Sequence, residues 1–453
     1  MIITERRERA LNALNYNRGE GSYTPPALGH YPHIYDWDTV FIAFVRARSG
    51  DIDGAKQELR VLFQTQNPKT GFIPNMTFAP GEKEFDPERL TFMTRRNSDY
   101  SQPMVSALAI QEIYEGLITQ GKLEDAISFH QEMFPHLQKE LKYWINNREN
   151  GRIHPPFASH LIGNIHPHET GRDADPTFDE PAKKFRLPTV GKDTNKLVRV
   201  ANTILDYAST LRLNRHLRSL DWDARKARRA FWVNDVMFNC IYADSLSVAA
   251  DLAETGNHSN AADLFRKRFK HVEEEILTKM WNEDDQMFYA LQDGKTHIPV
   301  VSVSNLFPLL LPNIKKEQLQ RMFDVMEDPD WFGTKYPLPS VPVNSKFYDP
   351  DYQEARIWRG PTWINMNWYL VKRGLLRQSK NLQEVDPELA QRCFRVGMHI
   401  ARQTAELIDQ GYFEFYNPET GKPLRTGTVR NFAWSTLGED LAEMAEDFGS
   451  HRW

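Results

Sequence analysis

The chain has 453 residues, enough to bury a large core, and 40% hydrophobic with 26% charged residues is typical of a soluble globular protein. Its formal net charge of -5 gives no broad basic surface, so the composition argues against nucleic acid as a partner. A small-molecule enzyme fits this balance better.

The sequence also argues against secretion and membrane insertion. Residues 5–9 are all charged, where a signal peptide would need an apolar region. The most apolar stretch, 298–312, is too short and too interrupted to span a bilayer. Cys240 and Cys393 are too few for a disulfide scaffold and not spaced as a metal motif. We therefore expect a cytoplasmic protein with no membrane partner.

Helical periodicity dominates the chain. Ala55, Leu59, Leu62 and Phe63 fall at i, i+4, i+7 and i+8, and the same spacing recurs at 137–145. No linker or change of composition divides the sequence, which predicts one domain over residues 1–453. The predicted helices are 4–16, 38–50, 52–66, 102–119, 122–133, 136–148, 195–217, 234–254, 258–281, 315–326, 361–374, 386–409 and 432–446.

The order of these helices favours a closed all-α barrel. Short turns flanked by aromatic residues recur at 67–72, 281–289 and 416–421, but without the fixed period of a solenoid. We therefore expect an (α/α)₆ barrel, a toroid of six helix hairpins. Its long loops, at 149–194 and 327–360, should gather at one rim.

The first of these loops contains a candidate general acid, Asp173. Crowding among acidic side chains raises some pKa values, and a general acid must hold its proton near neutral pH. Phe178 should add an apolar neighbour, and it also argues against a calcium loop because it stands where such a loop needs glycine. A solvated acidic loop is the alternative. Five acidic residues lie within residues 169–180 of this loop: Glu169, Asp173, Asp175, Asp179 and Glu180.

A second carboxylate, Glu414, lies among four aromatic residues just before the tight turn at 417–421. It either faces solvent on a hairpin or lies in a partly dry pocket, where ionisation is costly unless the residue is functional or paired. In the pocket, Glu414 would be the base that activates water. Two carboxyl groups brought together by a fold are the minimum equipment for glycoside hydrolysis.

Aromatic and polar side chains open three of the predicted helices. Such pairs suit a sugar ring, which has an apolar C–H face and a hydroxyl edge. The alternative is core packing, which we expect for Trp368. Candidates for sugar binding are Tyr35, Trp37, Asp38, Trp358, Gly360, Trp363 and Trp434.

Histidines cluster before the acidic loop, at His154, His160, His166 and His168. No cysteine or further histidine completes a zinc spacing, so the sequence argues against a metal site. Phosphate-loop, dinucleotide-binding and Gly-x-Ser-x-Gly patterns are absent from the sequence.

Together these segments resemble glycoside hydrolase family 63, whose members are inverting α-glycosidases with an (α/α)₆ barrel. The resemblance covers 169–179, 411–421, Trp37-Asp38, Gln102-Pro103 and the segment from Trp358 to Trp363, all in the family's order. It implies that Asp173 is the general acid, that Glu414 is the general base, and that Gln102 and Arg172 join the sugar-binding residues. Residues 172, 174, 175, 177 and 178 depart from the family pattern, which puts the substrate rather than the reaction in doubt.

Within the family, the chain is most similar to the short hydrolases of mannosylglycerate and glucosylglycerate, because its first sugar-site segment begins at residue 35. The resemblance implies that no metal or organic cofactor is required. An α-glucosidase for neutral oligosaccharides, a non-catalytic sugar-binding protein and an epimerase-like barrel remain alternatives, and homo-oligomerisation is compatible with the sequence. Candidate cations for a glycerate carboxylate are Arg95, Arg96, Arg172, Arg359 and Arg430.

Overall fold

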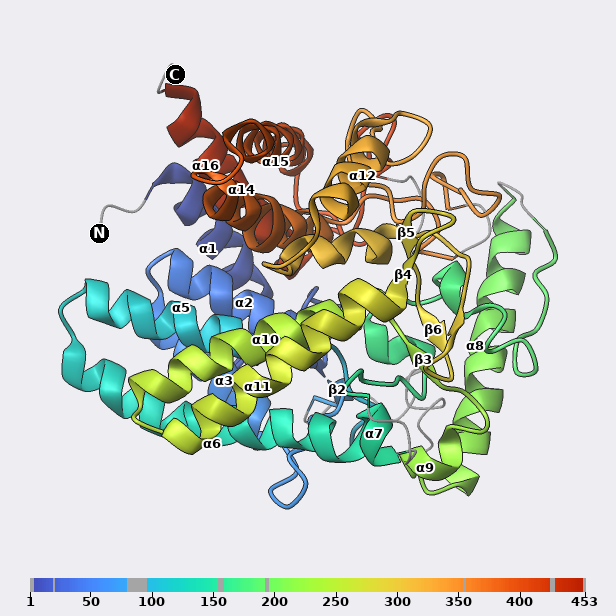
Figure 1. Cartoon of the computed structure of the whole chain (residues 1–453), viewed down its shortest axis with the longest axis horizontal. Helices are drawn as coiled ribbons and strands as arrows, with labels where there is room; N and C mark the ends of the chain where they lie inside the picture. Colours follow the sequence, from blue (N-terminus) through green and yellow to red (C-terminus); the bar gives the residue numbers. More distant parts are fainter. Residues whose placement is uncertain are drawn as a thin grey trace.

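Helices form most of the structure, which is a computed structural model (Figure 1). It describes residues 4–18, 21–79, 96–153, 159–191, 195–352, 356–423 and 428–450. Among these residues no helix is long and apolar enough to cross a membrane.

Six inner helical segments contact one another in a closed ring. Each packs against the next, and the last, α16, returns to α2. The inner segments are α2 (Asp36–Arg48), α5 (Ser106–Thr119), α10 (Val236–Thr255), η4 (Val303–Leu310), the continuous run α13 (Ile364–Trp368), η5 (Tyr369–Leu375) and α14 (Leu376–Leu382), and α16 (Leu437–Ser450).

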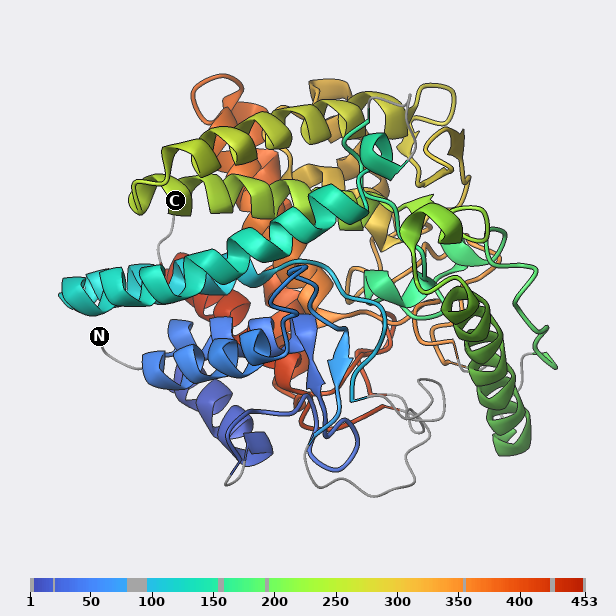
Figure 2. The ribbon, with the colours of Figure 1, turned by 90° about the horizontal axis from the view of Figure 1, so that it is seen from below.

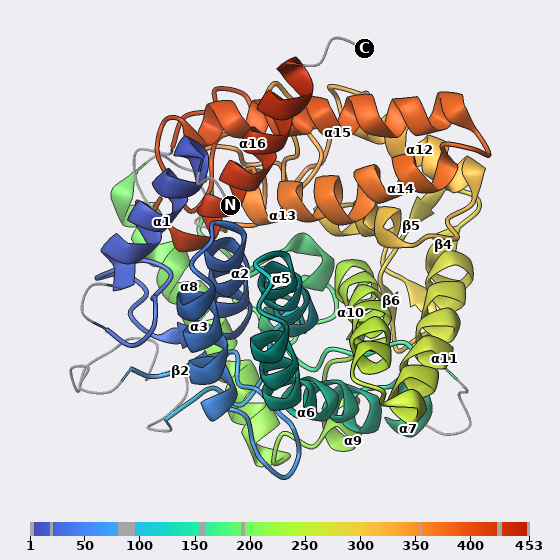
Figure 3. The same ribbon diagram turned by 90° about the vertical axis from the view of Figure 1, so that its left-hand side faces the viewer.

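Each inner segment has an outer partner, and several of these outer helices lie at the periphery of Figure 3. The last pair joins α16 to α1, so the two ends of the chain together close the ring. This arrangement is an (α/α)₆ barrel, as the sequence predicted. The outer helices, in the order of their inner partners, are α3 (Ile52–Gln64), α6 (Leu123–Asn147), α11 (Ser259–Glu275), α12 (Lys316–Glu327), α15 (Pro387–Ile408) and α1 (Glu5–Arg18).

The inner and outer helices differ in how many of their side chains are buried. Inner helix α10 is surrounded by protein, and nearly all its side chains are buried. Outer helix α15 buries only the stripe that includes Leu389, Cys393, Val396 and Ile400, at the spacing of one helix face. Asp386 caps α15 by accepting a hydrogen bond from the Leu389 N–H at 3.2 Å. Periodicity therefore finds outer helices more readily than inner ones.

Three details differ from the predicted helices. Segments 122–133 and 136–148 form one helix, α6, which continues through Pro135. The apolar stretch 298–312 contains an inner segment, η4, which is not among the predicted helices. The predicted helix 361–374 continues through η5 into α14.

Strands are short and lie in the connections. The pairs are β1–β2, β4–β5 and the three-stranded β3–β6–β7, all antiparallel. Helix α8 (Lys196–Ser219) follows the first long loop and projects from the barrel, as the green helix at the lower right of Figure 2 shows. The strands are β1 (Ile34–Tyr35), β2 (Met76–Thr77), β3 (Val233–Asn234), β4 (Trp281–Asn282), β5 (Met287–Phe288), β6 (Leu291–Gln292) and β7 (Thr296–His297), and the remaining short helices are α7 (Asn150–Ile153), η1 (Pro167–Thr170), η2 (Pro176–Phe178), α9 (Ala224–Ala227), η3 (Ile276–Met280) and η6 (Ala433–Thr436).

Candidate active site

A cavity of about 280 Å³ lies where several inner helices begin. Tyr35 and Trp363 precede the first residues of α2 and α13, and Trp434 lies in η6, immediately before α16. The two long loops contribute to the same cavity. Nine of the eleven residues predicted for the site line it: Tyr35, Trp37, Asp38, Gln102, Asp173, Trp358, Trp363, Glu414 and Trp434.

The cavity wall is strongly aromatic. The rings of Trp358 and Trp363 stack with centroids 4.0 Å apart and planes 2° from parallel. Trp434 meets Trp363 edge-on at 5.8 Å and Trp37 edge-on at 5.5 Å. All four line the cavity, so it presents a continuous apolar surface of the kind that the C–H face of a sugar contacts.

Polar groups accompany these rings. The Gln102 side-chain oxygen accepts a hydrogen bond from the backbone N–H of Trp37 at 3.3 Å, which joins two segments of the wall. Asp38 is buried, and burial is the main cause that raises its pKa to about 8, with the nearby charge of Asp173 adding to the shift. A carboxyl group with such a pKa is largely protonated at neutral pH and can donate a hydrogen bond to a substrate hydroxyl.

Asp173 differs from its loop neighbours in facing the cavity. Its side chain retains 46% exposure there, whereas Glu169, Arg172 and Asp175 are fully buried. Protein surrounds the cavity, so burial still raises the pKa of Asp173, and the charge of Asp206 raises it further while His168 opposes the shift.

The crowding of acids expected from the sequence is therefore not the cause of this shift. Glu169 pairs with Arg148 at 2.9 Å, and Asp179 pairs with Arg186 and Arg359, both at 2.6 Å. Asp206, the like charge that does act on Asp173, comes from helix α8 instead. Phe178 is also buried below the loop, beside Phe231, rather than in the cavity wall.

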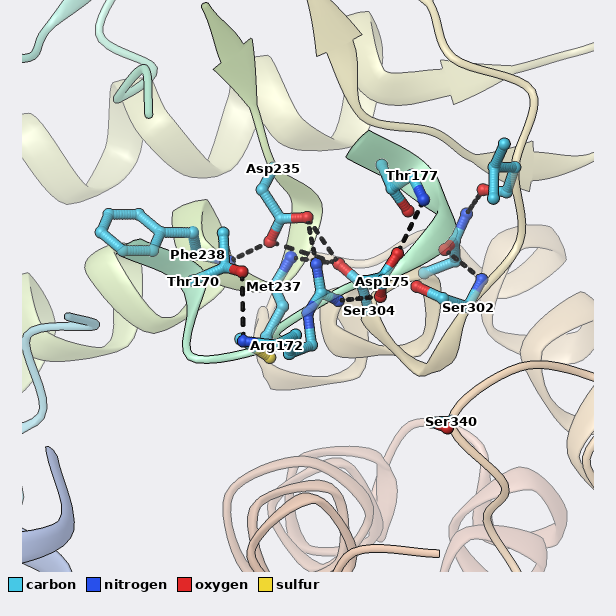
Figure 4. Close-up of polar contacts among 12 residues, drawn as sticks. Thr170, Arg172, Asp175, Thr177, Asp235, Met237, Phe238, Ser302, Ser304 and Ser340 are labelled. Carbon is cyan, nitrogen blue, oxygen red and sulfur yellow. Dashed lines mark hydrogen bonds and ion pairs between the residues drawn. The ribbon is translucent and has the colours of Figure 1, made fainter. Parts of the chain in front are cut away.

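Ion pairs beneath the loop fix its path (Figure 4). Arg172 bonds Asp235 at 2.5 Å and approaches Asp175 at 3.4 Å. Asp235 also caps α10 by accepting a hydrogen bond from the Phe238 N–H at 2.9 Å. The loop is thus tied to the N-terminal end of an inner helix, and Asp173, next to Arg172, projects the other way.

Arg172 therefore does not line the described cavity, and its contact with substrate stays a prediction. Its guanidinium is committed to two buried carboxylates. Gly360 does not line the cavity either. It has a φ of 152°, and a Cβ there would lie 2.6 Å from the Asp349 backbone, so it shapes the loop behind Trp358.

The other arginines proposed for a substrate carboxylate also lie outside the described cavity wall. Arg359 bonds Asp179 and the Ala174 carbonyl. Arg96 and Arg430 are exposed. Arg95 lies outside the described residues.

Glu414 lies in the drier part of the cavity. It is 5% exposed, and Tyr31 donates a hydrogen bond to its Oε1 at 3.2 Å. Burial raises the pKa of Glu414 to about 8, and the charges of Asp38 and Asp173 act in the same direction, while the Tyr31 hydroxyl opposes them. Of the two environments left open by the sequence, the pocket is therefore the one that Glu414 occupies.

Sequence reasoning missed a second group of cavity residues. Thr203, Asp206, Tyr207 and Thr210 line the cavity from one face of α8, at a spacing that periodicity could have grouped. Tyr31, Tyr100, His168 and Tyr352 also line it. No local pattern distinguishes these residues from ordinary loop residues, because their neighbours in the site are distant in sequence.

No group of three or more His, Cys, Asp or Glu side chains is arranged to hold a metal ion in the described ranges. The two cysteines, Cys240 and Cys393, are buried and unbridged. The functional groups of the described cavity are carboxyls, phenols, threonine hydroxyls, amides, one imidazole and aromatic rings.

An aromatic cavity that contains more than one carboxyl group has the equipment that glycoside hydrolysis requires. The model of the mannosylglycerate hydrolase MGH1-like glycoside hydrolase domain matches residues 31–435. The chain belongs to this family and is a glycoside hydrolase, as the resemblance to glycoside hydrolase family 63 implied.

Known proteins of the family are similar over nearly their whole length. The mannosylglycerate hydrolase of Thermus thermophilus is 27% identical over 94% of this chain and 98% of its own. The glucosylglycerate hydrolase of Mycolicibacterium hassiacum is 24% identical over 89% of this chain and 91% of its own. A crystal structure of a family 63 mannosylglycerate hydrolase from Thermus thermophilus with Tris and D-glycerate superposes with a TM-score of 0.76, at 24% identity, covering 96% of this chain and 99% of that one.

Proposed function

We propose that the protein is an inverting α-glycosidase that releases an α-linked glucosyl or mannosyl residue from glycerate. The observation that supports this reaction most directly is the presence of Asp173 and Glu414 in one cavity, in unlike environments. One carboxyl is half exposed and the other is nearly enclosed. The difference makes the two carboxyls chemically distinct, and their assignment as acid and base rests on the match of their segments to the family motifs.

In this mechanism Asp173 protonates the glycosidic oxygen as the C1–O bond breaks. Glu414 removes a proton from a water molecule that attacks C1 from the opposite face. The proton of the water ends on Glu414, the hydroxide oxygen ends on C1, and the leaving alcohol carries the proton of Asp173. In the closed complex we expect the two carboxyls to lie roughly 6.5–9.5 Å apart, which leaves room for the water.

The walls have separate tasks in this proposal. Trp37, Trp358, Trp363 and Trp434 contact the sugar ring and exclude water from C1. Asp38 and Gln102, together with Tyr35, bind ring hydroxyls. The face of α8 that bears Asp206 lines the same cavity as Asp173 and would contact the aglycone.

Glycerate is the aglycone that the relatives' names indicate, but the charge of the cavity favours a second candidate. Among the described lining residues there are four carboxyls, at Asp38, Asp173, Asp206 and Glu414, and no lysine or arginine. A neutral aglycone would avoid their charge. Hydrolysis of neutral α-glucosides is therefore the alternative activity.

Matched substrates distinguish the two aglycones. Glucosylglycerate and glucosylglycerol differ only at one carbon, which is a carboxylate in the first and a hydroxymethyl group in the second. The ratio of their kcat/KM values therefore measures what the carboxylate contributes. The proposal predicts a preference of at least about 10-fold for glucosylglycerate or mannosylglycerate, equivalent to one charge-assisted hydrogen bond. An equal or greater kcat/KM for glucosylglycerol would instead establish the neutral alternative.

Variants of the two carboxyls test the chemistry. We expect Asp173→Asn and Glu414→Gln each to lower kcat on the preferred glycoside by about 10²–10⁴-fold, since each removes a general acid or base. Substrate binding measured by calorimetry should persist in both. Glu419→Gln, at an exposed position of the turn at 417–421, is the matched control. Full activity in either cavity variant would contradict the assigned role.

A further inference from the structure

His168 is the imidazole nearest to the proposed general acid. Its Nε2 lies 3.9 Å from the Asp173 Oδ1, and both side chains line the cavity. The two residues are joined by η1 and by Gly171, whose left-handed conformation turns the chain back. Ligand-free catalytic contacts are often longer than those formed with substrate, and a small rotation of Asp173 would complete a hydrogen bond.

The other ring nitrogen of His168 is already bonded. Tyr100 Oη lies 3.2 Å from the His168 Nδ1. Tyr100 is itself held in place, because its ring stacks on His166 with centroids 4.4 Å apart and planes 5° from parallel. His166 also accepts the backbone N–H of His168 at 3.1 Å. Both the backbone and the ring of His168 are thus fixed.

We propose that Tyr100 and His168 form a positioning pair for Asp173, an inference that rests on the proposed function. When Tyr100 donates to Nδ1, the neutral ring carries its proton on Nε2 and directs it at Asp173. As Asp173 transfers its proton to the glycosidic oxygen, a carboxylate forms. The Nε2–H then stabilises that new negative charge, and the other carboxyl oxygen is left to face the substrate.

The surrounding charges agree with this role. Asp206 is the like charge that acts on Asp173 and holds its proton, and Arg186 lies 3.7 Å from Asp206. A hydrogen bond from the neutral His168 ring acts in the opposite direction, because it favours the carboxylate form of Asp173. The charge of a protonated His168 lowers the pKa of Asp173 as well. Asp206 therefore favours the protonated form of Asp173 in the resting enzyme, and His168 favours the carboxylate that forms in the transition state.

Leaving groups provide the decisive experiment. A glycoside needs its leaving oxygen protonated, whereas fluoride departs from an α-glycosyl fluoride with little help from an acid. We expect His168→Phe to lower kcat on the preferred glycoside by about 10–100-fold, the effect of one hydrogen bond to a charge. Hydrolysis of the matching α-glycosyl fluoride should change less than about 3-fold. Tyr100→Phe, which retains the ring stacked on His166, should show a smaller effect with the same selectivity.

Two further variants make the result unambiguous. Asp173→Asn should show the same selective loss, but larger. His399→Phe, at an exposed position on α15, is the matched control and should act like the unmodified enzyme. Equal losses on both substrates would assign His168 and Tyr100 a structural role and overturn the inference, as would full activity on the glycoside. Failure of the proposed function itself would be seen earlier, as an unmodified enzyme that hydrolyses neither substrate.

Discussion

Glu414 must be ionised to act as a base, yet it lies in a nearly enclosed part of the cavity near two other carboxyls. Its pKa of about 8 means that the base form of the free enzyme is lost as the pH falls through that value. The proposed mechanism therefore predicts a bell-shaped pH profile of kcat/KM, with an acidic limb set by the ionisation of Glu414 and a basic limb set by loss of the Asp173 proton. The Tyr31 hydroxyl favours the ionised form of Glu414 and so limits the rise of its pKa.

Tyr31→Phe tests that balance. Loss of the hydroxyl removes a hydrogen bond that lowers the pKa of Glu414, so the acidic limb of kcat/KM should move to higher pH. We expect a shift of roughly 0.5–1 pH unit, equivalent to one modest hydrogen bond. A full pH profile provides the measurement, and Tyr16→Phe, at an exposed phenol of α1, is the control. A limb that stays in place or moves to lower pH would contradict the assignment of Glu414 as the base.

Individual site residues were predictable where a local motif surrounds them. Asp173 and Glu414 stood out by their neighbours, and the aromatic residues stood out at helix starts. Arg172 was assigned to substrate by its position in a motif, and only the fold shows that Asp235, 63 positions away, takes its charge. Asp206 lies on a helix face that periodicity could have grouped, but nothing local marks that face as part of the site, and Tyr31 carries no local signal at all, because both are defined by proximity to residues on other elements.

At the scale of elements, the loop that bears Asp173 depends on a close approach between Gly171 and Trp37. Gly171 has a φ of +68°, and a Cβ there would lie 2.3 Å from the Trp37 ring. Gly121 has a similar φ of +73° with open space around it. A comparison of alanine variants at Gly121 and Gly171 therefore distinguishes the cost of backbone strain, which both share, from the cost of steric overlap, which only Gly171 has.

We expect Gly121→Ala to cost about 1 kcal/mol of unfolding free energy, the usual penalty for a left-handed residue with a Cβ. Gly171→Ala should cost about 1–3 kcal/mol more through overlap with Trp37, and should lower kcat at least about 10-fold by displacing Asp173. Denaturant unfolding and steady-state kinetics measure the two effects. Equal stability and equal activity in the two variants would show that the loop does not need this contact.

The ion pairs below the same loop give a second prediction. Arg172→Met leaves Asp235 and Asp175 buried without their cation, and should cost about 3–5 kcal/mol of unfolding free energy. Adding Asp235→Asn removes one uncompensated charge, so the double variant should regain part of that loss. Urea unfolding of the two variants provides the comparison. A double variant less stable than Arg172→Met would contradict this account of the network.

At the scale of the whole molecule, the fold was predictable because the outer helices of the barrel are amphipathic. α15 shows one apolar face, and its ends matched the predicted range 386–409 to within a residue. The inner segment η4 has eight residues, all of them buried, including the polar Ser304 and Asn305, so it is too short and too enclosed to show the apolar stripe of a surface helix. Ring closure by α1 and α16 joins the two ends of the chain, a contact that no local pattern encodes. That residues 1–453 form a single domain remains a prediction.

The central claim is hydrolysis with inversion by Asp173 and Glu414, and the anomer released first tests it most directly. Proton NMR of the purified enzyme with glucosylglycerate, mannosylglycerate and α-linked glucose disaccharides follows the anomeric signals in time. The account predicts that the β-sugar accumulates first from at least one substrate, with the α-anomer following only by mutarotation. Initial release of the α-anomer would contradict it, because retention requires a covalent intermediate on an enzyme carboxylate.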